Sequence, residues 1–177
     1  MRTSAILPNC FLCIAWFALP FSTMIAQTLQ SVPFVDLEKY SGKWYEIASF
    51  PQRFQKGCHC TTAEYTLSEK GYVIVENRCN RDSVNGKTSY IKGKAFVVKN
   101  SGNAQLKVQF FWPFKGNYWI IDLAEDYQYA VVSAPGKKYL WILSRTPRME
   151  EDAYQGILAR LKKMGFPLDK LRTTVQV

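Results

Sequence analysis

The sequence lacks most of the groups on which enzyme chemistry depends. It contains a single histidine, His59, among 177 residues, and no HExxH, GxSxG or glycine-rich phosphate loop. Most metal-dependent and triad enzymes need several histidines or one of these motifs, so the sequence argues against these classes. No basic helix or nucleic-acid motif accompanies its excess of lysine and arginine, and we expect no nucleic-acid partner.

Long apolar runs are also missing. The longest, from Phe11 to Phe21, contains Pro20 and is too short for a membrane-spanning helix, which needs about 20 apolar residues. Arg2 precedes this run, and small or polar residues follow it as far as Ala26. That order is typical of a secretory signal peptide. We predict a cleaved signal peptide over residues 1–26 and one domain over residues 27–177.

What the sequence does contain is a series of short alternating segments separated by turn residues. The expected strands are residues 43–51, 60–67, 72–79, 89–98, 105–111, 118–123, 129–133 and 139–144. Their spacing is that of hairpins, which predicts an all-β antiparallel meander, and eight strands close into a barrel with room for one small ligand. Acidic residues at 150–152, followed by apolar residues at helical spacing and Gly165, predict one helix on the outside of the barrel. A final extended piece over residues 171–177 is expected along the barrel wall.

Three motifs lie at the ends of these segments. Gly42-Lys43-Trp44 opens the first strand, Asp126-Tyr127 marks a turn between two later strands, and Arg145 follows the last strand. A guanidinium laid on the Trp44 indole by a cation–π contact would close the base of a barrel. The ordered trio resembles the motifs of the lipocalins, and strings such as WYEIASFPQRFQ and YLWILSRTP are similar to the bacterial outer-membrane, plant temperature-induced and apolipoprotein D subgroup.

The resemblance implies an eight-stranded antiparallel up-and-down lipocalin β-barrel with a C-terminal α-helix packed on its outside. It also implies an exported protein of the periplasm or outer membrane, or a secreted one if the host has no outer membrane. Such a protein would carry or store a fatty acid or lysophospholipid and act in envelope lipid maintenance or stress response. Bacterial relatives are often lipoproteins, but neither Cys10 nor Cys13 follows enough apolar sequence for a lipoprotein signal.

Two-residue alternation, anchored at Trp44 and Arg145, predicts which side chains point into the barrel. It places Glu46, Ala48 and Phe50 inside on the first strand, and Tyr139, Trp141 and Leu143 inside on the last. The resemblance adds Tyr118 and Trp141 as cavity positions. The predicted ligand-binding residues are Glu46, Val75, Asn77, Phe110, Tyr118, Tyr139 and Trp141, whereas Gly42, Trp44 and Arg145 form the structural base. We expect no cofactor and no metal site.

Export leaves Cys58, Cys60 and Cys79, all within one predicted hairpin. If Leu67 faces Tyr72 across the turn, Cys60 faces Cys79 at a separation compatible with a disulfide. We therefore predict a Cys60–Cys79 bridge worth about 3 kcal/mol. Cys58 is then a spare thiol or an alternative bridge partner.

Several functional alternatives stay open at this point. The formal net charge is +9, and basic side chains could ring one mouth of the barrel or be scattered over a solvated surface. A ring would favour anionic head groups or an anionic membrane surface. The residues considered for it are Arg53, Lys56, Arg78, Arg81, Lys87, Lys92 and Lys94. The same aromatic cavity could hold haem, a pigment or a steroid. A cysteine-dependent enzyme would need Cys58 inside the barrel with a lowered pKa. We expect a non-enzymatic carrier, monomeric or homodimeric.

Overall fold

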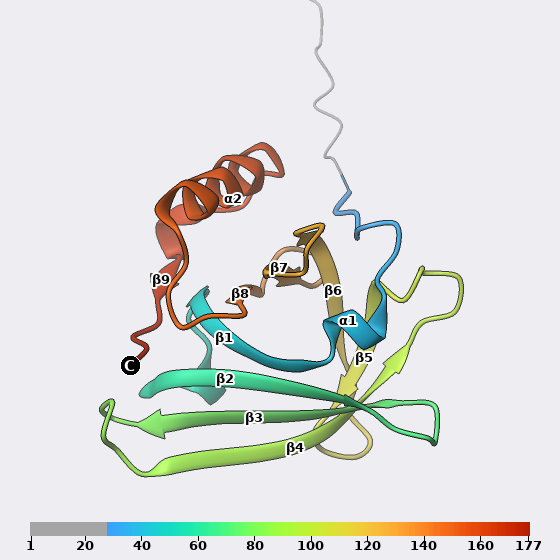
Figure 1. Ribbon diagram of the computed structural model, residues 1–177, viewed down its shortest axis with the longest axis horizontal. Helices are drawn as coiled ribbons and strands as arrows, with labels where there is room; N and C mark the ends of the chain where they lie inside the picture. Colours follow the sequence, from blue (N-terminus) through green and yellow to red (C-terminus); the bar gives the residue numbers. More distant parts are fainter. Residues whose placement is uncertain (1–27) are drawn as a thin grey trace, which may run out of the picture.

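The computed structural model describes residues 28–177 and shows a closed β-barrel (Figure 1). The predicted signal peptide, residues 1–26, lies outside the described residues. The barrel strands are β1 (Gly42–Ser49), β2 (Cys58–Leu67), β3 (Val73–Arg81), β4 (Thr88–Val97), β5 (Gln105–Gln109), β6 (Gly116–Leu123), β7 (Tyr129–Ser133) and β8 (Leu140–Ser144). Each pairs antiparallel with the next, and β1 pairs with both β2 and β8, which closes the sheet. The predicted eight-stranded antiparallel barrel is confirmed.

The predicted C-terminal helix is also present, as α2 (Glu151–Lys163). Ile157 and Leu161 bury its apolar side against residues of β1, β7 and β8, so the helix lies outside the barrel (Figure 1). Arg160 fixes it to β6, because its Nε lies 2.7 Å from the Asp122 carboxylate. Within residues 28–177, no helix is long and apolar enough to cross a membrane.

Three short helical elements lie before, between and after the barrel strands. They are α1 (Leu37–Tyr40), which begins after the N-cap Asp36 and precedes β1, and the 3-10 turns η1 (Arg53–Gln55) and η2 (Leu168–Lys170). The Asp36 carboxylate accepts hydrogen bonds from the backbone N–H groups of Glu38 and Lys39, which satisfies donors that a helix start leaves free. α1 lies at the base end of the barrel, directly before β1 (Figure 1), where the Tyr40 carbonyl accepts a hydrogen bond from Trp44 Nε1.

The core has two parts, on the two faces of the sheet. The interior part contains Trp44, Tyr65, Val75 and Val132, and the exterior part joins α2 to Val131 and its neighbours. The adjacent residues Val131 and Val132 face opposite sides, as strand alternation requires. The barrel interior is therefore mostly apolar, and a second buried surface lies between the barrel and α2.

The prediction that Ala48 and Phe50 point into the barrel is wrong. Both lie in the exterior core with α2. The pairing of β1 with β8 shifts between Glu46 and Ala48, so that Glu46 faces Leu143 and Ala48 faces Ile142. This β-bulge adds one residue to β1, and one extra residue exchanges the inner and outer faces for the rest of the strand.

The extended C-terminal segment lies along the barrel wall, as expected. Its short strand β9 (Arg172–Thr173) pairs with β1 at Ala48 and Ser49. Beyond it, the Thr174 N–H donates to the Ile47 carbonyl, and the Cys60 N–H donates to the Val175 carbonyl. The Ile47 carbonyl lies at the bulge of β1, and the Cys60 N–H lies at the irregular site of β2. The C-terminal segment therefore satisfies backbone groups that the bulges remove from the main ladder.

Candidate functional site

The barrel encloses a cavity of about 520 Å³, within the usual range for small-molecule sites. Its walls are mostly apolar, with contributions from Val75, Val108, Phe110 and Leu143. All the predicted ligand-binding residues line it: Glu46, Val75, Asn77, Phe110, Tyr118, Tyr139 and Trp141. The structure thus brings these residues together, and their contact with a ligand stays a prediction.

The base of the barrel is closed by the pair expected from the sequence. The Arg145 guanidinium carbon lies 3.8 Å from the centroid of the Trp44 ring, and its Nη1 donates to the Lys43 carbonyl at 3.0 Å. Gly42 has a φ of +93°, which favours glycine, and a Cβ there would lie 3.5 Å from Arg145. Partial burial lowers the pKa of Arg145 from its ordinary value, yet an arginine stays cationic in proteins. Neither Trp44 nor Arg145 lines the cavity.

Above this base, three tyrosine hydroxyls form the cavity floor and the layer beneath it. The Tyr118 hydroxyl lies 2.6 Å from that of Tyr40 and 2.8 Å from that of Tyr65. Burial raises the pKa of Tyr65 to about 12 and raises the pKa values of Tyr40 and Tyr118 well above their usual range. The cluster is therefore neutral at any physiological pH. Sequence reasoning found Tyr118 but missed Tyr65, although Tyr65 faces the predicted residue Val75 across β2 and β3.

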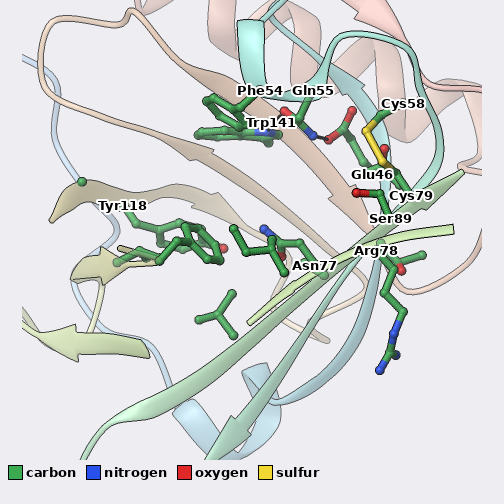
Figure 2. A pocket seen from close by; sticks show the side chains of 18 of the residues that line it. Glu46, Phe54, Gln55, Cys58, Asn77, Arg78, Cys79, Ser89, Tyr118 and Trp141 are labelled. Carbon is green, nitrogen blue, oxygen red and sulfur yellow. Dashed lines mark hydrogen bonds between the residues drawn. A yellow bond between two sulfur atoms is a disulfide. The ribbon is translucent and has the colours of Figure 1, made fainter. Parts of the chain in front are cut away.

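At the mouth, a hydrogen-bonded chain connects Glu46 to Trp141 (Figure 2). The buried Glu46 carboxylate accepts hydrogen bonds from Ser49 Oγ, Gln55 Nε2 and Thr174 Oγ1 at 2.9, 2.8 and 2.6 Å. Gln55 in turn accepts from Trp141 Nε1 at 3.1 Å. Sequence reasoning missed Gln55, because it lies in the loop between β1 and β2, where strand alternation says nothing. The chain holds the Trp141 ring in a fixed orientation over the cavity.

The disulfide joins Cys58 to Cys79, so the predicted Cys60–Cys79 bridge is wrong. Leu67 faces Val73 rather than Tyr72, which moves the whole register of β2 and β3 by one residue. A second irregularity lies between His59 and Thr62, where Cys60 has a φ of +51°. The two shifts leave Cys58 opposite Arg81 and within 5.4 Å (Cα–Cα) of Cys79. Strand bulges are not visible in the residue pattern, so the error could not have been avoided by counting.

The same bridge removes the thiol on which the enzyme alternative relied. Cys58 is oxidised, and a disulfide sulfur is not the nucleophilic thiolate that the alternative requires. Within residues 28–177, Cys60 is the one cysteine without a disulfide partner. No group of histidine, cysteine or acidic residues in this part of the chain could hold a metal ion.

The basic side chains divide between the mouth and the outer wall. Arg81 lies at the mouth, where its guanidinium donates to the Lys56 carbonyl and to Ser89 Oγ, and Arg53 and Lys56 line a hollow next to the cavity. The Arg78 guanidinium points away from the cavity and pairs with Glu64 on the outer wall at 3.3 Å (Figure 2). Lys94, however, lies over the Tyr72 ring beside the turn between β2 and β3, at the base end, so it does not belong to the predicted ring. Lys92 pairs with Glu76 on β3 at 3.4 Å. Lys115 borders the cavity in the loop between β5 and β6, but its Nζ lies over the Phe96 ring, which packs against Tyr72, so its charge points to the outer wall.

Large exposed aromatic rings lie at the same mouth. Phe54, Phe111 and Phe114 line the cavity entrance with 62%, 69% and 75% of their surface exposed. Trp112, between the latter two in the loop joining β5 to β6, is 87% exposed. The mouth thus combines apolar rings with positive charge, in contrast to the closed base.

Comparison with known proteins agrees with this geometry. Residues 35–176 match the model of the lipocalin-like domain family. The chain is 40% identical to temperature-induced lipocalin-1 of Arabidopsis thaliana, covering 84% of this chain and 83% of the plant protein. It is 41% identical to the outer membrane lipoprotein Blc of Escherichia coli strain K12, covering 76% of each. Among solved structures, insecticyanin of Manduca sexta shares the fold with a TM-score of 0.68 at 21% identity, covering 84% of this chain and 85% of the other. The chain belongs to the lipocalin family.

Proposed function

We propose that this protein is an exported, non-enzymatic carrier or store for a fatty acid or lysophospholipid held in the barrel cavity. The observation that carries the proposal is the apolar cavity of about 520 Å³, closed at one end and bordered by polar groups at the other. Each buried methylene contributes about 0.8 kcal/mol, so an acyl chain of a dozen or more carbons can reach micromolar affinity.

The mouth supports a ligand with a polar head group. Arg81 at the entrance, with Arg53 and Lys56 in the hollow beside it, gives this end of the barrel positive charge, which suits a carboxylate or a phosphate. Haem is less well supported, because no histidine or methionine lies among the described residues that line the cavity. Steroids and other flat ligands are alternative outcomes of the test below.

The proposed place of action is the cell envelope, at an anionic membrane surface. Two observations support it: the exposed aromatic rings at the mouth and the basic side chains around them. The name of the bacterial relative, an outer membrane lipoprotein, points to the same compartment. A role in maintaining envelope lipids or in stress response follows from this location, and the protein would act there as a monomer or homodimer.

Tryptophan fluorescence gives a direct test of where the ligand binds. Trp141 lines the cavity, whereas Trp119 packs against the exterior core. Titration with hexadecanoic acid and with lysophosphatidylcholine should quench the emission saturably at micromolar ligand. The quenching should be largely lost in Trp141→Phe and retained in Trp119→Phe, while both variants keep the barrel's circular dichroism spectrum.

Two results would contradict the proposal. If neither lipid class gives a saturable response, and native mass spectrometry of the purified protein shows no bound lipid, the lipid-carrier function is wrong. If Trp141→Phe is quenched as strongly as the unaltered protein, a ligand binds but does not lie next to Trp141. A response only to steroids or tetrapyrroles would favour the flat-ligand alternative.

A further inference from the structure

The hydroxyl cluster at the cavity floor has more protons than its own hydrogen bonds use. Tyr40, Tyr65 and Tyr118 carry three hydroxyl protons, and the two contacts at Tyr118 use two of them. One O–H donor in the cluster therefore has no acceptor within it. A buried donor without an acceptor is costly, so this proton needs a partner from elsewhere.

The geometry indicates which tyrosine carries the unused hydroxyl proton. Tyr65 and Tyr118 line the cavity, whereas Tyr40 lies behind them, against Trp44. The Tyr40 hydroxyl has no other hydrogen-bond partner among the described residues than Tyr118. An arrangement that left the spare proton on Tyr40 would strand it in the core, so the proton belongs to Tyr65 or Tyr118 and faces the cavity.

Other unpaired polar atoms lie on the same wall. Thr61 Oγ1 and Asn77 Oδ1 are buried, and both residues line the cavity; neither atom has a hydrogen-bond partner within residues 28–177. Asn77 faces Ala63 on β2, one inward position nearer the mouth than the facing pair Tyr65 and Val75. Polar groups thus extend from the floor toward the mouth along β2 and β3, although apolar contacts alone would suffice to hold a plain hydrocarbon chain.

From this geometry we propose that the floor is a subsite for a neutral oxygen, a hydroxyl or a carbonyl, at the buried end of the ligand. The cavity would then prefer an oxygenated acyl chain to a plain one. The proposal rests on the lipid-carrier function and deepens it. A methyl end placed at the floor would leave the spare O–H unpaired, whereas an oxygen would accept its hydrogen bond. The raised pKa values agree with a neutral donor, since an ionised floor would repel the lone pairs of such an oxygen.

The test compares two probes that differ by one oxygen, hexadecanoic acid and ω-hydroxyhexadecanoic acid. We expect the unaltered protein to bind the hydroxy acid at least as tightly as the plain acid, although water solvates the hydroxy acid better. In the triple variant Tyr40→Phe, Tyr65→Phe and Tyr118→Phe, the plain acid should bind more tightly and the hydroxy acid more weakly. The ratio of the two dissociation constants should change by about tenfold or more.

The triple variant is designed to fold, because replacing all hydrogen-bonded partners by apolar groups of the same shape is close to neutral. Tyr154→Phe on α2, outside the barrel, is the matched control and should leave the ratio unchanged. Should the triple variant not fold, the ratio in the unaltered protein still decides. If the unaltered protein binds the plain acid about tenfold or more tightly than the hydroxy acid, the polar floor is wrong but the lipid-carrier function stands. The same holds if the ratio of the two dissociation constants is unchanged in the triple variant. Binding of neither acid overturns both.

Discussion

At the scale of single residues, Arg145 connects two parts of the chain that are far apart in the sequence, the α1–β1 segment and the turn between β6 and β7. Its guanidinium covers Trp44, and its N–H groups donate to the carbonyls of Lys39, Lys43 and Tyr127. These carbonyls belong to α1, to β1 and to the turn between β6 and β7. One planar side chain with five donors can make these contacts at once, which a lysine cannot.

We therefore predict that Arg145→Lys lowers the free energy of unfolding by about 1–3 kcal/mol, through lost cation–π and hydrogen-bond contacts. Urea denaturation followed by circular dichroism measures the change. Arg148→Ala, an exposed arginine three residues further on, is the control and should change stability by less than about 0.5 kcal/mol. Equal stability of Arg145→Lys and the unaltered protein would show that the base is held by other contacts.

At the scale of the elements, the disulfide joins β2 and β3 at the end of the hairpin opposite its turn. The bridge joins residues 21 positions apart, and closing a loop of this length contributes about 3 kcal/mol by restricting the unfolded chain. We predict that replacing both Cys58 and Cys79 by serine lowers the free energy of unfolding by this amount under oxidising conditions. The double variant and the unaltered protein should become equally stable, within error, in the presence of a reductant.

The variant Cys60→Ser distinguishes the observed Cys58–Cys79 bridge from the Cys60–Cys79 bridge that the sequence predicted. Cys60 has no disulfide partner in the part of the chain that the structure describes, so its replacement should change the unfolding free energy by less than about 1 kcal/mol in either redox condition. A loss of about 3 kcal/mol confined to oxidising conditions would instead assign the bridge to Cys60.

These elements also show how far the sequence could predict the structure. The strands, α2 and the inward direction of Glu46, Asn77 and Trp141 follow from alternation, because those stretches are regular. Alternation fails at Ala48 and at Cys60, where β1 and β2 each depart from the regular ladder. Both departures lie under the C-terminal segment, whose hydrogen bonds to Ile47 and Cys60 compensate them. A long-range contact of this kind leaves no mark on the local residue pattern, so the sequence alone could not reveal it.

At the scale of the whole molecule, the two ends of the barrel differ in what they expose. The base is closed by buried aromatic rings under Arg145. The mouth exposes four aromatic rings near Arg81, Arg53 and Lys56, namely Phe54, Phe111, Trp112 and Phe114. Exposed aromatic rings next to basic side chains favour the interface of an anionic bilayer, where rings enter the head-group region and charges stay near phosphates. Docking in this orientation would bring the cavity entrance to the lipid surface.

We therefore predict that the protein floats with vesicles of phosphatidylcholine and phosphatidylglycerol, and less with phosphatidylcholine alone. Phe114→Ser should weaken the binding by roughly tenfold, since it removes one partly inserted ring. The matched control is Phe34→Ser, because Phe34 is 61% exposed but precedes α1 at the base. High salt should weaken binding to the anionic vesicles by screening the basic side chains. If both variants lose binding equally, the contact is not made by the mouth. If neither does, the aromatic loop does not enter the bilayer, and the lipid must reach the cavity from solution.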